Sequence, residues 1–161
     1  MKTAALVIAL SLAAAPALAQ NAAQVARAAA GADCPRCNLF QADLGNKVLK
    51  GRDFAGARLR QSDLSLSVFN HTTFAGADLR DVNGYGALFT DANFAGANLT
   101  NATLVGAYLQ GANFRGARLS GVNFSGAEMD RAVGLSQGQL DAACGDDTTR
   151  LPRGYRIPTC R

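Results

Sequence analysis

The residues of this chain best suited to chemistry are four cysteines among its 161 residues. Cys34 and Cys37 form a CPRC motif, and this CxxC spacing is typical of thiol–disulfide oxidoreductases. Such proteins carry the motif at a helix N-terminus beside a βαβ pattern, and neither is evident here. We therefore favour a buried structural disulfide, and we keep a thiol–disulfide protein that uses Cys34 and Cys37 as an alternative.

No other catalytic constellation is visible in the sequence. His71 is the only histidine, and it cannot complete a zinc site, which needs four converging ligands. The carboxylates recur within a repeating pattern that is typical of a solvated surface, and there is no glycine-rich phosphate loop. The sequence thus predicts a protein that is not an enzyme and that holds no metal or cofactor.

The elements that position these residues follow from a five-residue repeat that runs from Cys37 to Arg131. Of its nineteen central positions, from Leu39 to Met129 in steps of five, eighteen are Leu, Phe or Met, and only Gly84 differs. Two positions earlier the residue is usually small, most often alanine. A strict fixed period indicates a solenoid, in which each repeat buries its apolar face by stacking on its neighbours.

A longer period of twenty residues gives the number of sides. Two columns of central residues are uniform, namely Leu39, Leu59, Leu79, Leu99 and Leu119, and Phe54, Phe74, Phe94 and Phe114. Like residues therefore stack on like, with four repeats in each turn. At about 4.8 Å between neighbouring strands, nearly five turns make a rod roughly 24 Å long with a packed interior.

Three segments carry a resemblance to a known family. AGADL (75–79), FAGANL (94–99) and FRGARLSGVNF (114–124) resemble the pentapeptide-repeat family. The resemblance implies an all-β fold, a right-handed quadrilateral parallel β-helix. Lys47 and Arg52 depart from the pattern, because the family has small inward residues at their positions. Both lie in the first turn, and we interpret them as tolerance at the end of the rod.

The chain outside the repeat divides into three parts. Residues 1–19 combine Lys2, an apolar run and a small-x-small site, which is typical of a signal peptide cleaved before Gln20. Residues 20–36 form an N-terminal cap, with a short helix expected over 21–30. The β-helix then covers 37–131, and an irregular C-terminal cap covers 132–161, with a helix from Gln137 to Cys144 after an N-cap at Ser136. We expect a periplasmic or secreted protein with no transmembrane segment in the mature chain.

The cysteine count also bears on this compartment. An even number of cysteines in an exported chain implies two disulfides with three possible connectivities. We expect the pairs Cys34–Cys37 and Cys144–Cys160, because bridges between the two ends need Cα atoms within about 7 Å across several turns. A C-terminal segment that folds back so far is disfavoured, but it stays open.

The surface of the rod is the remaining source of functional information. The residue before each central residue faces outward, and three of the four outward columns are polar throughout. The fourth column reads Val48, Val68, Leu88 and Tyr108 before it ends at Glu128. Leu66, Tyr85 and Val105 flank it around one corner. We call these seven residues the apolar stripe, and they predict a contiguous patch of roughly a few hundred Å².

Two explanations of the apolar stripe stay open. Either the C-terminal cap folds back over it, or it is a protein interface, in its simplest form an isologous dimer. A separate alternative is binding to an envelope surface through four arginines that share one face. These are Arg58, Arg60, Arg80 and Arg118.

The charge balance argues against nucleic-acid roles. The best-known members of the family imitate DNA and bind type II topoisomerases, which requires a strongly negative rod. Residues 37–131 carry nine basic and eight acidic residues, a net charge of +1. The basic residues are interleaved with acids and lack an aromatic platform, so nucleic acid is not an expected partner. The sequence therefore predicts a non-catalytic exported repeat scaffold that binds a protein partner or a second copy through the apolar stripe.

Overall fold

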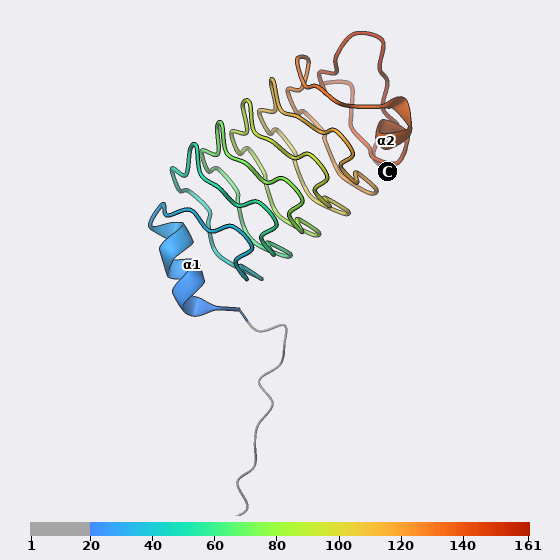
Figure 1. The fold of residues 1–161 in the computed structure, drawn as a ribbon. Coiled ribbons are helices and arrows are strands. Elements are labelled where there is room, and N and C mark those ends of the chain that lie inside the picture. The colour runs from blue at the N-terminus through green and yellow to red at the C-terminus, as the bar shows by residue number, and fades with distance from the viewer. Residues whose placement is uncertain (1–19) are drawn as a thin grey trace, which may run out of the picture.

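The computed structural model describes residues 20–161, so the expected signal peptide at 1–19 lies outside the described residues. The order of elements is helix α1 (Ala22–Ala29), the coiled repeat, and helix α2 (Gln137–Asp141). Figure 1 shows a rod of stacked coils, with α1 at one end and α2 and the C-terminus at the other. Within the described part of the chain, neither helix has the length and apolar content needed to cross a membrane.

The coils form a four-sided β-helix. Parallel β-bridges join residues twenty apart, from Asn38–Arg58 through to Asn113–Val133. The four ladders of bridges start at Asn38, Asp43, Val48 and Asp53, and we call the corresponding sides A, B, C and D. Each bridge is a single pair of residues, so no side contains an extended strand. The predicted four repeats per turn are confirmed by this pairing.

The corners of the square turn through residues with positive φ, such as Gly56 and Gly76 on the corner after side D. Outward polar side chains support these turns. Asp53 Oδ1 accepts a hydrogen bond from the backbone N–H of Ala55 at 2.8 Å, and Asn93 Oδ1 accepts one from Ala95 at 3.0 Å. Short Asx side chains bond readily to the backbone two residues ahead. This explains why most outward columns are rich in Asp and Asn.

The interior of the rod is filled by the central residues. Phe54, Phe74, Phe94 and Phe114 stack face to face, with ring centroids 5.3 to 5.6 Å apart. Phe69 and Phe89 from the neighbouring column meet these rings edge to face. Both arrangements suit the charge distribution of aromatic rings. The interior is therefore a continuous packed core.

Gly84 interrupts this core without leaving a ligand site. A Cβ added at Gly84 would lie 2.7 Å from Leu104 Cδ2 and 3.4 Å from a ring carbon of Phe89. Leu104 and Phe89 thus already occupy the place of the missing side chain. The packing at Gly84 therefore leaves no room for a bound molecule at this position.

Helix α1 lies across the N-terminal end of the rod (Figure 1). Asn21 is its N-cap, and its side chain accepts from the N–H of Gln24 at 3.1 Å. The Gln24 Oε1 atom accepts from the N–H of Asn38 at 2.6 Å, so the helix replaces a missing coil on side A. Ala28 is fully buried against the core. The alanine-rich composition of this segment allows that close approach to the first coil.

Lys47 and Arg52 face different surroundings in the first coil. Lys47 is exposed, whereas Arg52 is partly buried, and its Nε has no hydrogen-bond partner among the described residues. The backbone N–H groups of both residues donate to side-chain hydroxyls of the coil above, to Ser67 at 2.9 Å and to Thr72 at 3.4 Å. The backbone at both positions therefore keeps its place in the coil despite the long side chains.

The C-terminal part extends the rod by an irregular sixth turn. Helix α2 begins with a capping box between Ser136 and Gln139, as the predicted N-cap requires. It ends at Asp141, earlier than the expected Cys144, because Cys144 returns to the ladder of side B by pairing with Asn123. Arg150 then continues side C by pairing with Glu128. Side chains from the final residues, among them Leu151, Tyr155 and Ile157, pack on the end of the core.

Asp146 holds the loop that connects these last two sides. Its Oδ1 accepts from the Thr148 hydroxyl at 2.7 Å and from the N–H of Gly126 at 3.0 Å. These hydrogen bonds, the Thr148 hydroxyl first, lower the pKa of Asp146 from 3.8 to about 2. The ionised carboxylate therefore joins the last turn to the coil below it.

We expect Phe74→Ala to lower the free energy of unfolding by about 3–5 kcal/mol, because it removes a fully buried ring between two stacked neighbours. Denaturation in urea measures the change. Phe40→Ala is the matched control, since Phe40 is only partly buried at a corner and should cost clearly less. Equal losses at the two positions would contradict the stacked core.

We expect Asp146→Asn to lower the stability of the C-terminal turn in a pH-dependent way. A carboxylate whose folded pKa is lowered stabilises the fold above its ordinary pKa near 3.8, and this contribution disappears as the pH falls towards 2. Thermal unfolding of the variant and the wild type should therefore differ most above pH 5 and converge near pH 2. Asp147→Asn is the control, and a gap that did not narrow in acid would count against this role.

Candidate protein-interaction face

Side C of the rod carries the outward column of the apolar stripe. Val48, Val68, Leu88 and Tyr108 pair consecutively through parallel β-bridges, so their side chains stand directly above one another. The exposed fraction is 70% for Val48 and 46% for Tyr108, while Val68 and Leu88 are half-buried between their neighbours. Four apolar side chains are thus presented in one row on a flat surface.

The corner between sides B and C adds the flanking residues of the apolar stripe. Leu66 and Tyr85 are 54% and 53% exposed, and Val105 is half-buried. Leu66 has a φ of 56°, a left-handed conformation that bulky residues seldom adopt. The other non-glycine residues described with positive φ are all polar. A leucine at this corner therefore has an unfavourable backbone and an exposed apolar side chain at once.

The C-terminal segment does not cover the apolar stripe. It packs across the end of the rod, where the Tyr155 hydroxyl donates to the carbonyl of Leu135 at 2.9 Å. The backbone N–H of Cys160 donates to the carbonyl of Gly145 at 2.8 Å, which keeps the last residues beside the sixth turn. Figure 1 shows this segment at the end opposite α1. The sequence left open whether the C-terminal cap covers the apolar stripe. The exposed fractions of Val48, Tyr108, Leu66 and Tyr85 disagree with such a cover.

The cysteines form the two expected pairs. Cys34 and Cys37 are joined within the first turn, and Cys144 is joined to Cys160 across the last. Cys34 is fully buried and Cys37 is 6% exposed, so an attacking thiolate cannot reach either sulfur without local opening. The disulfide of the CPRC motif is therefore buried at the N-terminal end of the core.

No metal site accompanies these cysteines within residues 20–161, where no group of three or more potential ligands converges. His71 lies at an exposed corner, with its Nδ1 3.8 Å from Asp91 Oδ2. Both side chains are more than half exposed, so this contact contributes little to stability.

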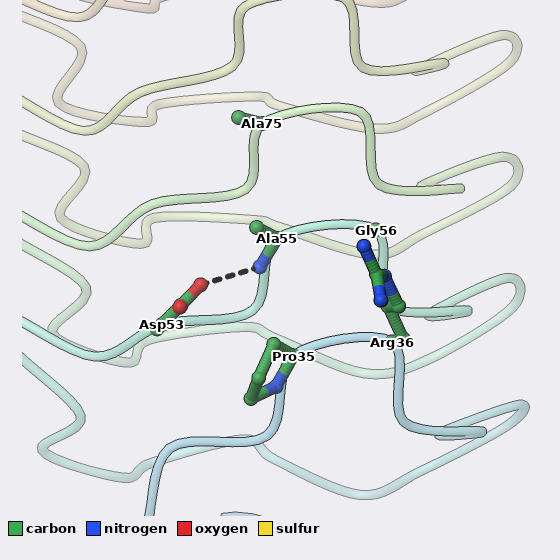
Figure 2. A pocket seen from close by; sticks show the side chains of 6 residues that line it. All are labelled: Pro35, Arg36, Asp53, Ala55, Gly56 and Ala75. Atoms are coloured by element: carbon green, nitrogen blue, oxygen red, sulfur yellow. Dashed lines mark hydrogen bonds between the residues drawn. The ribbon is translucent and has the colours of Figure 1, made fainter.

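A shallow pocket of about 510 Å³ lies beside the CPRC turn, at the corner between sides D and A. Pro35, Arg36, Asp53, Ala55, Gly56 and Ala75 line it, as Figure 2 shows. Asp53 is already used by its hydrogen bond to the N–H of Ala55. The sequence did not predict this pocket, since its one sequence signal is the run of small Ala and Gly residues at the corner. The lining offers no nucleophile and no pair of groups for acid–base chemistry.

The arginine face on side A is partly neutralised. Arg80 forms a bidentate pair with Asp78, at 2.7 and 2.6 Å, and this pair lowers the pKa of the Asp78 carboxyl. Arg60 lies 3.2 Å from Asp81. Two of the four arginines are therefore engaged by carboxylates of the same face, which weakens the case for binding an anionic surface.

We expect the Cys34–Cys37 disulfide to resist reduction in the folded protein, because its sulfur atoms are buried. Dithiothreitol followed by alkylation and mass spectrometry should label Cys144 and Cys160 first, since both are only half-buried. In denaturant the two disulfides should be reduced at similar rates. Rapid native reduction of Cys34–Cys37 would instead favour the thiol–disulfide alternative.

Comparisons with known proteins identify the repeat. A family model described as pentapeptide repeats matches eight copies, over residues 49–83 and 87–126. No curated protein matches the chain. Solved structures that match include a pentapeptide repeat protein from the thylakoid lumen of Arabidopsis thaliana, with 31% identity over 62% of this chain and 65% of that one, at a TM-score of 0.35. Another is the pentapeptide repeat protein Rfr23 from the cyanobacterium Cyanothece 51142, with 24% identity over 68% and 64%, at a TM-score of 0.34.

QnrB1, a plasmid-mediated fluoroquinolone resistance protein, matches at 22% identity over 76% of each chain, with a TM-score of 0.30. The chain thus spans somewhat less than two thirds of the length of the first two structures. The matched repeats coincide with the coils whose fourfold pairing is described above. The chain therefore belongs to the pentapeptide-repeat family, whose members fold as right-handed quadrilateral β-helices.

Proposed function

We propose that the protein is a non-catalytic, exported repeat scaffold whose apolar stripe binds another protein chain. The observation that carries this proposal is the exposed row of Val48, Val68, Leu88 and Tyr108 on side C. Exposed apolar patches of this size on a soluble rod usually mark interaction sites. The unfavourable backbone of Leu66 adds support, since the rod itself gains nothing from a leucine there.

Export to the periplasm or the medium is part of the same proposal. Two disulfides suit an oxidising compartment, and residues 1–19 have the composition of a signal peptide. In the mature chain, residues 20–36 and 132–161 would serve as caps on the β-helix of 37–131. Solenoids need such ends to remain soluble and monodisperse.

The alternatives have weaker support. Thiol–disulfide chemistry requires accessible sulfur atoms, and those of Cys34 and Cys37 are buried. Binding of an anionic envelope surface requires free arginines, and Arg60 and Arg80 are paired with carboxylates. Only Arg58 and Arg118 of that face lack a carboxylate partner among the described residues.

The proposal predicts site-specific cross-linking. A photoreactive amino acid at Val68 of the full chain, expressed in its source cells, should form a covalent protein adduct. The same probe at Asn98, on the opposite side A, should not, because that ladder is polar. Leu88→Asp should remove the adduct by placing a charge in the centre of the apolar stripe, whereas Asn93→Asp on side D should leave it intact.

Two results would contradict the proposal. One is the absence of any adduct from Val68 when the protein is folded and exported. The other is an equal yield of adducts from Val68 and Asn98, since this would indicate contact without preference for the apolar stripe.

A further inference from the structure

Counting each coil as one level, the first and fifth levels of side C carry opposite charges. The first of its five levels carries Lys47 and Lys50, both exposed, around Val48. The fifth level carries Glu128, half-buried in the row, and Asp130, exposed at the corner. The three levels between them are apolar in the outward row. A basic level, three apolar levels and an acidic level thus follow one another on one face, and the exposed Arg150 lies one level beyond the acidic one.

Four charged groups of these two levels lack ion-pair partners in the part of the chain that the structure describes. None of Lys47, Lys50, Glu128 and Asp130 belongs to an ion pair among residues 20–161. The nearby Arg131 donates to Gln110 Oε1 at 2.6 Å instead, and Arg150 stands one level beyond Glu128. The Glu128 carboxylate accepts a hydrogen bond from the Gln110 amide at 3.3 Å. The charges at both ends are therefore available to a partner.

The apolar residues of the three middle levels of side C are arranged symmetrically about Leu88. Leu88 stands at the third level, with Val68 and Tyr108 one level away on either side. The corner repeats this order, because Tyr85 lies at the third level between Leu66 and Val105. Reversing the direction of the rod therefore places the apolar residues of the three middle levels on one another and the lysine level on the acidic level. Val48 then lies opposite the half-buried Glu128.

We infer that the partner of the apolar stripe is a second copy of this chain, bound face to face with the two rods antiparallel. The inference rests on the proposed function and specifies its partner. The twofold axis runs parallel to the strands of side C at the level of Leu88. Lys50 then lies opposite Asp130 of the second copy, because a twofold axis along the strands keeps each corner on its own side. A parallel arrangement would place lysine against lysine, which is unfavourable.

The size of the face fits this assembly. Five levels at about 4.8 Å, with corner side chains on both sides, give a face of roughly 24 by 20 Å. Two copies then bury about 1,000 Å², which is at the lower limit for specific protein interfaces. At that size the charged ends, which lie at the solvent-exposed rim, select the orientation, and their contribution falls as salt increases.

Charge reversal tests the orientation by sedimentation of the full mature chain. Lys47→Glu with Lys50→Glu should weaken dimerisation by about tenfold or more, because acidic groups then meet at both rims. Glu128→Lys with Asp130→Lys should do the same with basic groups. The chain that carries all four substitutions should recover wild-type affinity. Urea unfolding of each variant separates loss of association from loss of fold.

An engineered cysteine tests the position of the axis. Oxidised Leu88→Cys protein should form a covalent dimer, because residue 88 meets its own copy at the axis. Asn98→Cys on side A is the control and should stay monomeric. If charge reversal at one level alone leaves the dimer unchanged, the inference is overturned. Lys47 and Lys50 would then serve only to prevent the exposed backbone of the first coil from pairing with another chain.

The proposed function and this inference fail in different ways. A wild-type chain that remains monomeric at all concentrations, yet forms Val68 adducts of another mass in cells, refutes the antiparallel dimer and keeps the apolar stripe as an interface. A dimer that Leu88→Asp does not disturb refutes both for this face.

Discussion

The twenty-residue register is the constraint on which the rest of the structure depends. Each coil bonds to the next through two alternating contacts, such as Leu44 N–H to the carbonyl of Asp63 at 2.8 Å and Asp63 N–H to the carbonyl of Ala42 at 2.9 Å. A shift by one residue would move the Leu and Phe side chains out of the core. The register therefore fixes which residues are buried, and it also forces every outward residue into a ladder with its equivalents in the other coils.

In a rod of stacked coils, the backbone groups that lack hydrogen-bond partners lie at the two ends. An interior coil satisfies its backbone groups on both sides, but the first and last coils have only one neighbour. At the N-terminal end Gln24 supplies an acceptor to side A, and Asp33 Oδ1 accepts from the N–H of Asp53 at 3.0 Å on side D. Among the described residues, the N–H groups of Asp43 and Val48 receive no such partner. At the other end, α2 and Asp146 close the last turn.

The parts of the structure that follow from the register could be predicted from sequence. The four columns, the packed core, both disulfides and the N-cap of α2 at Ser136 all follow from periodicity, cysteine placement or capping chemistry. The sixth turn could not, because Cys144 and Arg150 resume their ladders after spacings of 21 and 22 residues. Nor could the filling of the Gly84 position, since it depends on how Leu104 packs in the coil above. The pairing of Arg60 and Arg80 with carboxylates depends on rotamers, which a sequence pattern does not fix.

Each ladder places equivalent residues of successive coils next to one another, so residues of one chemical type form a continuous row. The apolar stripe contains such a row. Polar ladders stabilise the rod from within, because Asp and Asn side chains bond the backbone of their own corners. Val68 and Leu88 cannot do so, and Leu66 has a left-handed backbone as well. An exposed apolar row on an otherwise polar rod also favours association with any other apolar surface. Since the rod gains little from these residues, their placement supports the proposed contact with another chain, and in that proposal the charged residues beside the row restrict which orientation fits.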